Sequence, residues 1–177
     1  MATRREFFKS FAKPLTQNQE EELLLIRPPY GKSESLFQNK CPSCLSKDCV
    51  TSCDEKIIFI AEDGTPTLDF KQNGCTFCDE CAKSCKEAVL SLENSHTKDR
   101  LNATFQISID RCVAHNGVIC YSCKEPCIDD AILFNGMFNP IIDEDRCTGC
   151  GFCISRCPTQ AIKFKVLKIE ENNESAK

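Results

Sequence analysis

The spacing of the cysteines constrains this chain more than any other feature. Sixteen cysteines fall into four groups of four along 177 residues. The second and fourth groups read C-x2-C-x2-C-x3-C, and Pro158 follows the fourth group. This run places three thiolates on one tight loop and is the one that ferredoxins use to hold [4Fe–4S] clusters. The four groups are Cys41, Cys44, Cys49 and Cys53; Cys75, Cys78, Cys81 and Cys85; Cys112, Cys120, Cys123 and Cys127; and Cys147, Cys150, Cys153 and Cys157.

The first and third groups have longer spacers. Group one reads C-x4-C at Leu45–Asp48, and group three reads C-x7-C at Val113–Ile119. Each group still supplies four thiols, so we expect four [4Fe–4S] clusters in all. The longer loops should change solvent access and the backbone N–H bonds to sulfur, which set reduction potentials.

Three other uses of cysteine fit the pattern less well. Disulfides require an oxidising compartment, and cysteines three residues apart on a loop are poorly placed to pair with one another. Zinc sites typically bring two C-x2-C pairs together, whereas here three thiols fall within seven residues twice over. Structural cysteines without a ligand would not recur at this period. The spacing therefore favours iron–sulfur clusters.

Composition excludes several other classes of protein. With no tryptophan, two tyrosines and 41% apolar residues, the chain cannot build a large core, so metal centres should stabilise part of the fold. A formal charge of −4 argues against nucleic-acid binding. No apolar stretch is long enough to span a membrane. No nucleotide-binding glycine motif and no pairing of nucleophile with base is readable, so we expect no catalysis of its own.

An internal repeat pairs group one with group two and group three with group four. Between the paired groups, segments 57–59 and 67–70 and segments 132–134 and 141–143 each read as a β-hairpin. Segment 104–109 alternates with period two and should pair with 162–166. The class we predict is α+β, with two tandem ferredoxin-like dicluster modules at 34–95 and 96–167. An arm at 1–33 precedes them and a polar tail at 168–177 follows. The polar linker at 93–102 fits either a surface loop between packed modules or a flexible joint.

The arm carries a twin-arginine-like segment. Thr3-Arg4-Arg5-Glu6-Phe7-Phe8 matches the start of an export signal, but charged and polar residues follow it where an apolar region would be needed. We therefore expect no export. Two interpretations stay open: the segment is a basic amphipathic turn, or it docks a partner through Phe7 and Phe8, with Arg4 and Arg5 steering the encounter.

These features together resemble the NapF family, ferredoxin-type accessory proteins of periplasmic nitrate reductase. The resemblance covers nearly the whole chain. Its most specific elements are Ile26-Arg27-Pro28-Pro29-Tyr30 and the C-x7-C of group three. It also includes Arg4-Arg5, the Cys75-Thr76-Phe77-Cys78 opening and Cys147-Thr148-Gly149-Cys150-Gly151. Group one departs from the family, whose first group is compact.

The resemblance implies a cytoplasmic protein with four [4Fe–4S] clusters that acts on the precursor of the reductase's catalytic subunit before export, in its iron–sulfur maturation. The alternative is a general ferredoxin-type electron carrier that feeds a reductase; a third is an exported redox subunit. Four all-thiolate clusters would bring the charge to about −12, which favours a positively charged partner surface.

Crossed ligation, in which the fourth cysteine of one group binds the cluster of its paired group, predicts the ligand sets. They are Cys41, Cys44, Cys49 and Cys85; Cys75, Cys78, Cys81 and Cys53; Cys112, Cys120, Cys123 and Cys157; and Cys147, Cys150, Cys153 and Cys127.

Overall fold

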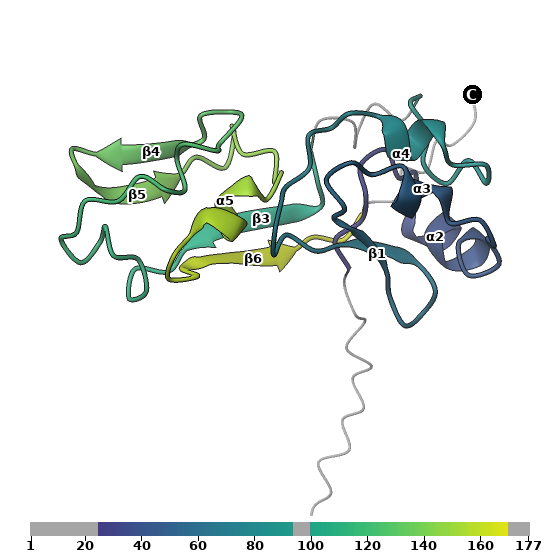
Figure 1. Ribbon diagram of the computed structural model, residues 1–177, viewed down its shortest axis with the longest axis horizontal. Coiled ribbons are helices and arrows are strands. Elements are labelled where there is room, and N and C mark those ends of the chain that lie inside the picture. Colours follow the sequence, from purple (N-terminus) through teal and green to yellow (C-terminus); the bar gives the residue numbers. More distant parts are fainter. Residues whose placement is uncertain (1–24, 94–99, 170–177) are drawn as a thin grey trace, which may run out of the picture.

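The fold is α+β and is built from short elements, as a computed structural model of residues 25–93 and 100–169 shows (Figure 1). The predicted class is therefore confirmed. The helices are α2 (Glu34–Lys40), α3 (Asp48–Thr51), α4 (Glu80–Lys83) and α5 (Phe152–Arg156). The strands are β1 (Ile58–Ile60), β2 (Pro66–Leu68), β3 (Ala103–Ile107), β4 (Ile132–Asn135), β5 (Phe138–Ile142) and β6 (Ile162–Val166).

Some sequence predictions lie outside the described residues. They are the twin-arginine-like segment with Arg4, Arg5, Phe7 and Phe8, most of the linker, and the tail from residue 170 onward. Among residues 25–93 and 100–169, no helix is long and apolar enough to cross a membrane.

Three two-stranded antiparallel sheets organise the part of the chain that the structure describes. The hairpins β1–β2 and β4–β5 lie where the sequence predicts them, with Phe59 opposite Thr67 and Leu133 opposite Ile141. The predicted pairing of β3 with β6 is also confirmed. Strand β3 ends at Ile107, two residues before the predicted end, because the Ser108 carbonyl accepts hydrogen bonds from the next turn and diverts the chain.

A segment at residues 25–31, here called the strap, packs into the first half of the chain (residues 25–93). The Ile26 carbonyl accepts hydrogen bonds from the backbone N–H of Leu68 (2.9 Å) and the hydroxyl of Thr67 (3.1 Å). At its other end, the Tyr30 carbonyl accepts from the Ser91 N–H at 2.9 Å. Ile26 and Tyr30 are buried. The last residues of the sequence-predicted arm thus contribute to the core.

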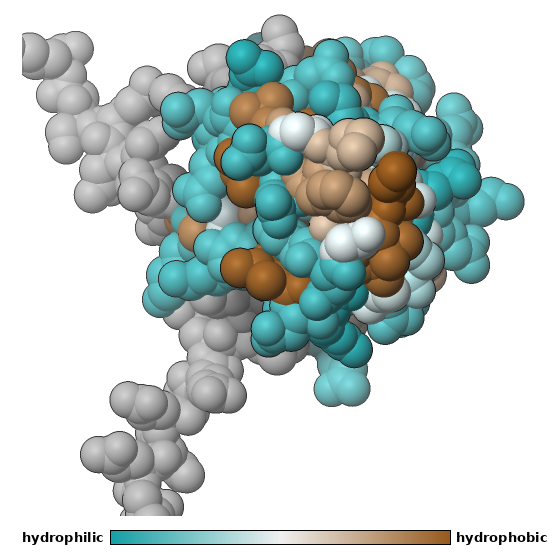
Figure 2. Space-filling view, turned by 90° about the vertical axis from the view of Figure 1, so that its left-hand side faces the viewer, coloured by the Kyte–Doolittle hydropathy of each residue, from teal (hydrophilic) through white to brown (hydrophobic). Residues whose placement is uncertain are grey.

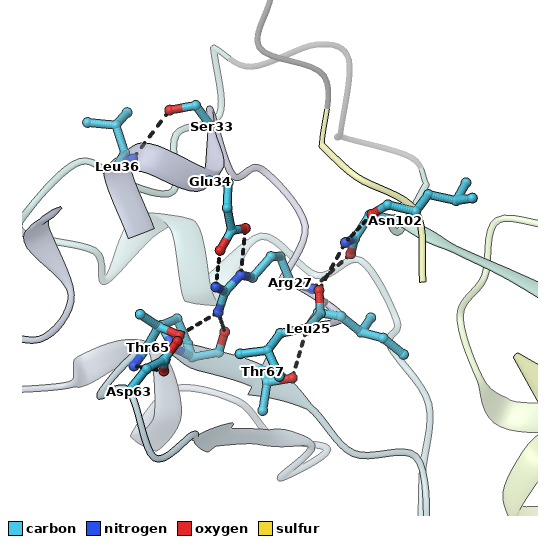
Figure 3. Close-up of polar contacts among 12 residues, drawn as sticks. Leu25, Arg27, Ser33, Glu34, Leu36, Asp63, Thr65, Thr67 and Asn102 are labelled. Carbon is cyan, nitrogen blue, oxygen red and sulfur yellow. Dashed lines mark hydrogen bonds and ion pairs between the residues drawn. The ribbon is translucent and has the colours of Figure 1, made fainter. Parts of the chain in front are cut away.

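Arg27 is the buried charge of the strap, with 2% of its surface exposed. Its guanidinium donates to both carboxylate oxygens of Glu34, at 2.9 Å from Nε and by a second bond from Nη2 (Figure 3). Nη1 donates to Thr65 Oγ1 at 2.6 Å and to the Pro66 carbonyl at 2.9 Å. The guanidinium also lies 4.9 Å from the centroid of the Phe37 ring. Arg27 therefore ties the strap to α2 and β2.

Asn102 connects the strap with the second half of the chain (residues 100–169). Its side-chain oxygen accepts from the Arg27 N–H at 2.8 Å, and its amide nitrogen donates to the carbonyls of Leu25 and Leu167, both at 3.0 Å (Figure 3). The Leu167 N–H in turn donates to the Asn102 carbonyl at 2.7 Å. One amide side chain thus holds the start of the first half against the end of β6.

The two halves also meet directly, which answers the question that the linker left open. The rings of Phe70 and Phe105 pack edge to face with centroids 6.1 Å apart. The N–H of Cys75 donates to the carbonyl of Cys150 at 2.7 Å. Buried residues from both halves form one continuous core. The halves are packed together rather than joined by a flexible hinge.

Candidate metal centres

The structure places thiols from different groups in shared pockets. Pro29, Ile57, Ile58 and Leu68 form the apolar part of one pocket. The thiols that line this pocket are Cys75, Cys78 and Cys81 of group two and Cys53 of group one. The fourth cysteine of group one therefore lies with the first three cysteines of group two.

A second pocket repeats this arrangement in the other half. Phe105, Ile132 and Ile142 supply apolar walls. The thiols in this pocket are Cys147, Cys150 and Cys153 of group four and Cys127 of group three. The two compact groups thus have equivalent surroundings, each with one thiol from the preceding group.

Group one lies beside Cys85, the fourth cysteine of group two. Burial raises the pKa of Cys41 and of Cys49 to about 11, and the charge of Cys85 adds to both shifts. Helices α3 and α4 bring these residues together, with a 2.9 Å hydrogen bond between the hydroxyls of Ser52 and Ser84.

Group three lies beside Cys157, the last cysteine of group four. Cys112 packs with Ala114 and Ala161 in a small buried cluster, and Cys120 and Cys157 border it. Burial raises the pKa of Cys123 to about 11, with further contributions from the charges of Cys112, Cys157 and Cys120. Each of the two groups with long spacers therefore lies beside the last cysteine of the following group.

All four groups end in the same backbone turn, which the sequence analysis did not foresee. The third residue after the last cysteine has a positive φ, between 50° and 54°, and its N–H donates to the carbonyl of that cysteine. These residues are Lys56, Ala88, Asp130 and Gln160. Because L-residues other than glycine seldom adopt this conformation, its recurrence in all four groups indicates a functional constraint.

The turn aims backbone N–H groups at sulfur. The N–H of Ala131 donates to Cys127 Sγ at 3.3 Å, and that of Ala161 donates to Cys157 Sγ at 3.2 Å. The N–H of Leu90 approaches Cys85 Sγ at 3.5 Å. Hydrogen bonds of this kind stabilise a negatively charged thiolate and tune iron–sulfur potentials, so the cysteine sites fit a cluster.

The arrangement of the thiols does not match a zinc site. Four thiolates around one zinc ion lie about 3.8 Å from each other, given a Zn–S bond of about 2.3 Å. Within the parts of the chain that the structure describes, no three Cys, His, Asp or Glu side chains are arranged to hold a single metal ion. A cubane separates its ligands more widely, because each thiolate binds a different iron.

Comparisons with known proteins agree with this geometry. The 4Fe–4S binding domain family matches residues 140–163, which contain group four. The ferredoxin-type protein NapF of Escherichia coli (strain K12) is 34% identical over 147 residues, which cover 80% of this chain and 85% of that protein. The chain belongs to the NapF family. The resemblance inferred from the sequence is therefore confirmed.

Two further relatives extend the comparison. NapF of Haemophilus influenzae (strain Rd) is 31% identical over 176 residues, which cover 95% of this chain and 96% of that protein. The ferredoxin-type protein NapG of the same organism is 27% identical over 180 residues, which cover 88% of this chain and 64% of that protein. The similarity to NapF thus includes the region of the strap and all four cysteine groups.

The long spacer of group three is an exposed feature of this NapF-family chain. Val118 and Ile119, next to Cys120, are 55% and 60% exposed. His115 Nε2 lies 3.0 Å from the Pro140 carbonyl and anchors the spacer to β5. Figure 2 faces this end of the molecule and shows hydrophobic residues gathered among hydrophilic ones.

Cluster loading of the folded chain is expected to keep accelerating from about pH 7 to about pH 9.5, beyond the pH at which ordinary thiols are already ionised. Burial raises the pKa of Cys75 and Cys81 to about 12, far above the ordinary thiol value of about 8.5. Neutral thiols stabilise the folded cluster-free chain fully below about pH 8.5, and this contribution is lost as the pH rises through about 12. Iron must displace the protons, and the thiolate fraction grows about tenfold per pH unit below the pKa.

The rate of loading with ferrous iron and sulfide, followed anoxically by visible absorbance, measures this effect. A chain unfolded in urea is the control, because its thiols titrate at the ordinary value and its iron uptake should level off near pH 8.5. A folded chain whose loading rate stays constant over this range would contradict the prediction.

Proposed function

We propose that this chain is a cytoplasmic iron–sulfur protein that assists maturation of the catalytic subunit of periplasmic nitrate reductase before export. It acts as a helper protein rather than as an enzyme. The observation that carries the proposal is that paired cysteine groups share pockets, Cys53 with group two and Cys127 with group four, in a chain of the NapF family.

The proposed ligand sets follow the crossed pattern, and each set holds one [4Fe–4S] cluster. Set one is Cys41, Cys44, Cys49 and Cys85, and set two is Cys75, Cys78, Cys81 and Cys53. Set three is Cys112, Cys120, Cys123 and Cys157, and set four is Cys147, Cys150, Cys153 and Cys127. The shared pockets and the closing turns support this assignment. A bound cluster supplies one-electron transfer, and each pair of sets forms a dicluster module.

The proposed partner is the precursor of the catalytic subunit, with its export peptide still attached. An anoxic pull-down of the tagged chain from cytoplasm, with captured proteins identified by mass, tests this. Recovery of that precursor supports the maturation role. Recovery of general reductases alone would instead favour the alternative, an electron carrier without a dedicated partner.

Replacing Arg4 and Arg5 together by alanine is expected to weaken capture of the precursor at least about tenfold without lowering iron content. The reason is that basic side chains beside Phe7 and Phe8 can steer and anchor a partner. The control is Lys163→Ala with Lys165→Ala, which removes the same charge from exposed positions on β6. Equal capture by both double variants would show that the arm is not part of the docking site. A fall in iron would show that the arm is part of the fold.

A further inference from the structure

We propose that Gly74 and Gly151 are positioning residues that hold set two against set four, so that the four cluster sites follow one another in the spatial order one, two, four, three. This inference rests on the proposed ligand sets. The order differs from the order of the groups along the chain, and it makes set one and set three the two ends of a single path.

The contact between sets two and four is made by the backbone of their own ligands. The N–H of Cys75 donates to the carbonyl of Cys150 at 2.7 Å, so one hydrogen bond joins a residue of set two to a residue of set four. Both cysteines are buried. Asn102 and the ring pair Phe70–Phe105 also link the two halves, but neither involves a cysteine.

Glycine at two positions permits this approach. A Cβ on Gly74 would lie 2.5 Å from the Phe152 nitrogen and 2.6 Å from the Cys150 carbonyl oxygen, which are backbone atoms of the opposite half. A Cβ on Gly151 would lie 2.3 Å from the ring of Phe70. Since side chains do not approach backbone atoms this closely, any larger residue at Gly74 must push the halves apart.

Within each half, one short helix fixes the spacing of two sets. Helix α4 carries Cys81 of set two, and Cys85 of set one follows its last turn. Helix α5 carries Cys153 of set four and ends at Cys157 of set three. Residues four apart along a helix are separated by about one turn, or about 6 Å along the axis. Sets one and two are therefore neighbours, as are sets four and three.

Sets one and three lie far apart. Figure 1 shows α2, which precedes group one, and α3, which carries Cys49, at one end of the elongated molecule, and β4 and β5 at the other. The group-three spacer is anchored to β5 through His115. With clusters bound, an electron passing from set one to set three would go by way of sets two and four, because these two sets lie between them. The contacts between neighbouring sets thus define the order one, two, four, three.

Magnetic coupling between reduced clusters tests the order. Cys44→Ala with Cys120→Ala disables sets one and three and leaves sets two and four, whereas Cys44→Ala with Cys147→Ala leaves sets two and three. Each double variant, loaded anoxically and reduced with dithionite, is examined by electron paramagnetic resonance. We expect a broadened, split signal when sets two and four remain, and the sum of two independent signals when sets two and three remain. The reverse result overturns the order.

The role of Gly74 is tested in the variant that retains sets two and four. Gly74→Ala should reduce the splitting while iron stays at about eight atoms per chain. Gly136→Ala is the control for local backbone strain. Its φ of 70° disfavours a side chain, but a Cβ there would meet nothing within 4 Å and so would not push the halves apart. A splitting that Gly74→Ala leaves unchanged would overturn the positioning role. Iron well below eight atoms in the parent double variant would instead count against the proposed ligand sets.

Discussion

Replacing Cys85 by alanine is expected to release about four of sixteen iron atoms and to expose Cys41, Cys44 and Cys49, which lie some forty residues earlier in the chain. The reason is that Cys85 lies beside group one, where its charge contributes to the raised pKa of Cys41 and of Cys49. Alanine is preferred to serine because a serine oxygen can remain a ligand. Anoxic alkylation of the folded variant, followed by peptide mass mapping, identifies which thiols have lost protection.

The reciprocal variant, Cys53→Ala, makes the result decisive. Cys53 shares a pocket with the first three thiols of group two, so its loss should expose Cys75, Cys78 and Cys81 and leave group one protected. If each group instead held its own cluster, the two labelling patterns would be exchanged. Equal labelling of all seven thiols in either variant would show that the first half unfolds, and analysis of iron together with circular dichroism distinguishes that outcome.

Replacing Arg27 by methionine should lower the free energy of unfolding by at most roughly 3–5 kcal/mol, because the change removes a buried charge from a partly buried ion pair and leaves its acceptors without a donor. Here those groups are the carboxylate of Glu34, the hydroxyl of Thr65 and the carbonyl of Pro66. The midpoint of anoxic urea unfolding of the loaded protein, followed by far-UV circular dichroism, measures the effect.

Two further variants provide comparisons for that measurement. Arg27→Lys keeps the charge but has no planar fork to reach all the acceptors, so an intermediate loss is expected. Arg146→Met is the matched control, since Arg146 is 58% exposed and faces Asp143 at 3.4 Å, and an exposed pair is worth at most about 1 kcal/mol. If Arg27→Met and Arg146→Met unfolded at the same urea concentration, Arg27 would not be the anchor of the strap.

Local sequence patterns predicted those parts of the molecule that depend on local chemistry. Alternation of apolar residues gave both hairpins and the pairing of β3 with β6, because one face of each strand must be buried. The fixed spacings of groups two and four predicted a 4Fe–4S binding domain, which the family match at residues 140–163 confirms for group four. Crossed ligation remains a prediction that the pockets support.

Features that depend on tertiary packing could not be read from the sequence. Arg27 would ordinarily be placed on the surface, and only the combined acceptors of Glu34, Thr65 and Pro66 make its burial tolerable. The closing turns use residues such as Lys56 and Ala88, which give no sign of a positive φ. Gly74 belongs to no motif, and its role becomes visible only when the opposite backbone lies against it.

The position of Asn102 has a consequence for the order in which the chain can be completed during synthesis. Its side chain binds Leu25 and Arg27 at the beginning of the fold and Leu167 at the end of β6. A nascent chain that has emerged only as far as the first two cysteine groups still lacks the amide that closes the strap. Arg27, Ile26 and Tyr30 can therefore hold the strap within the first half alone, whereas its hydrogen bonds to Asn102 form only after the second half has begun to emerge.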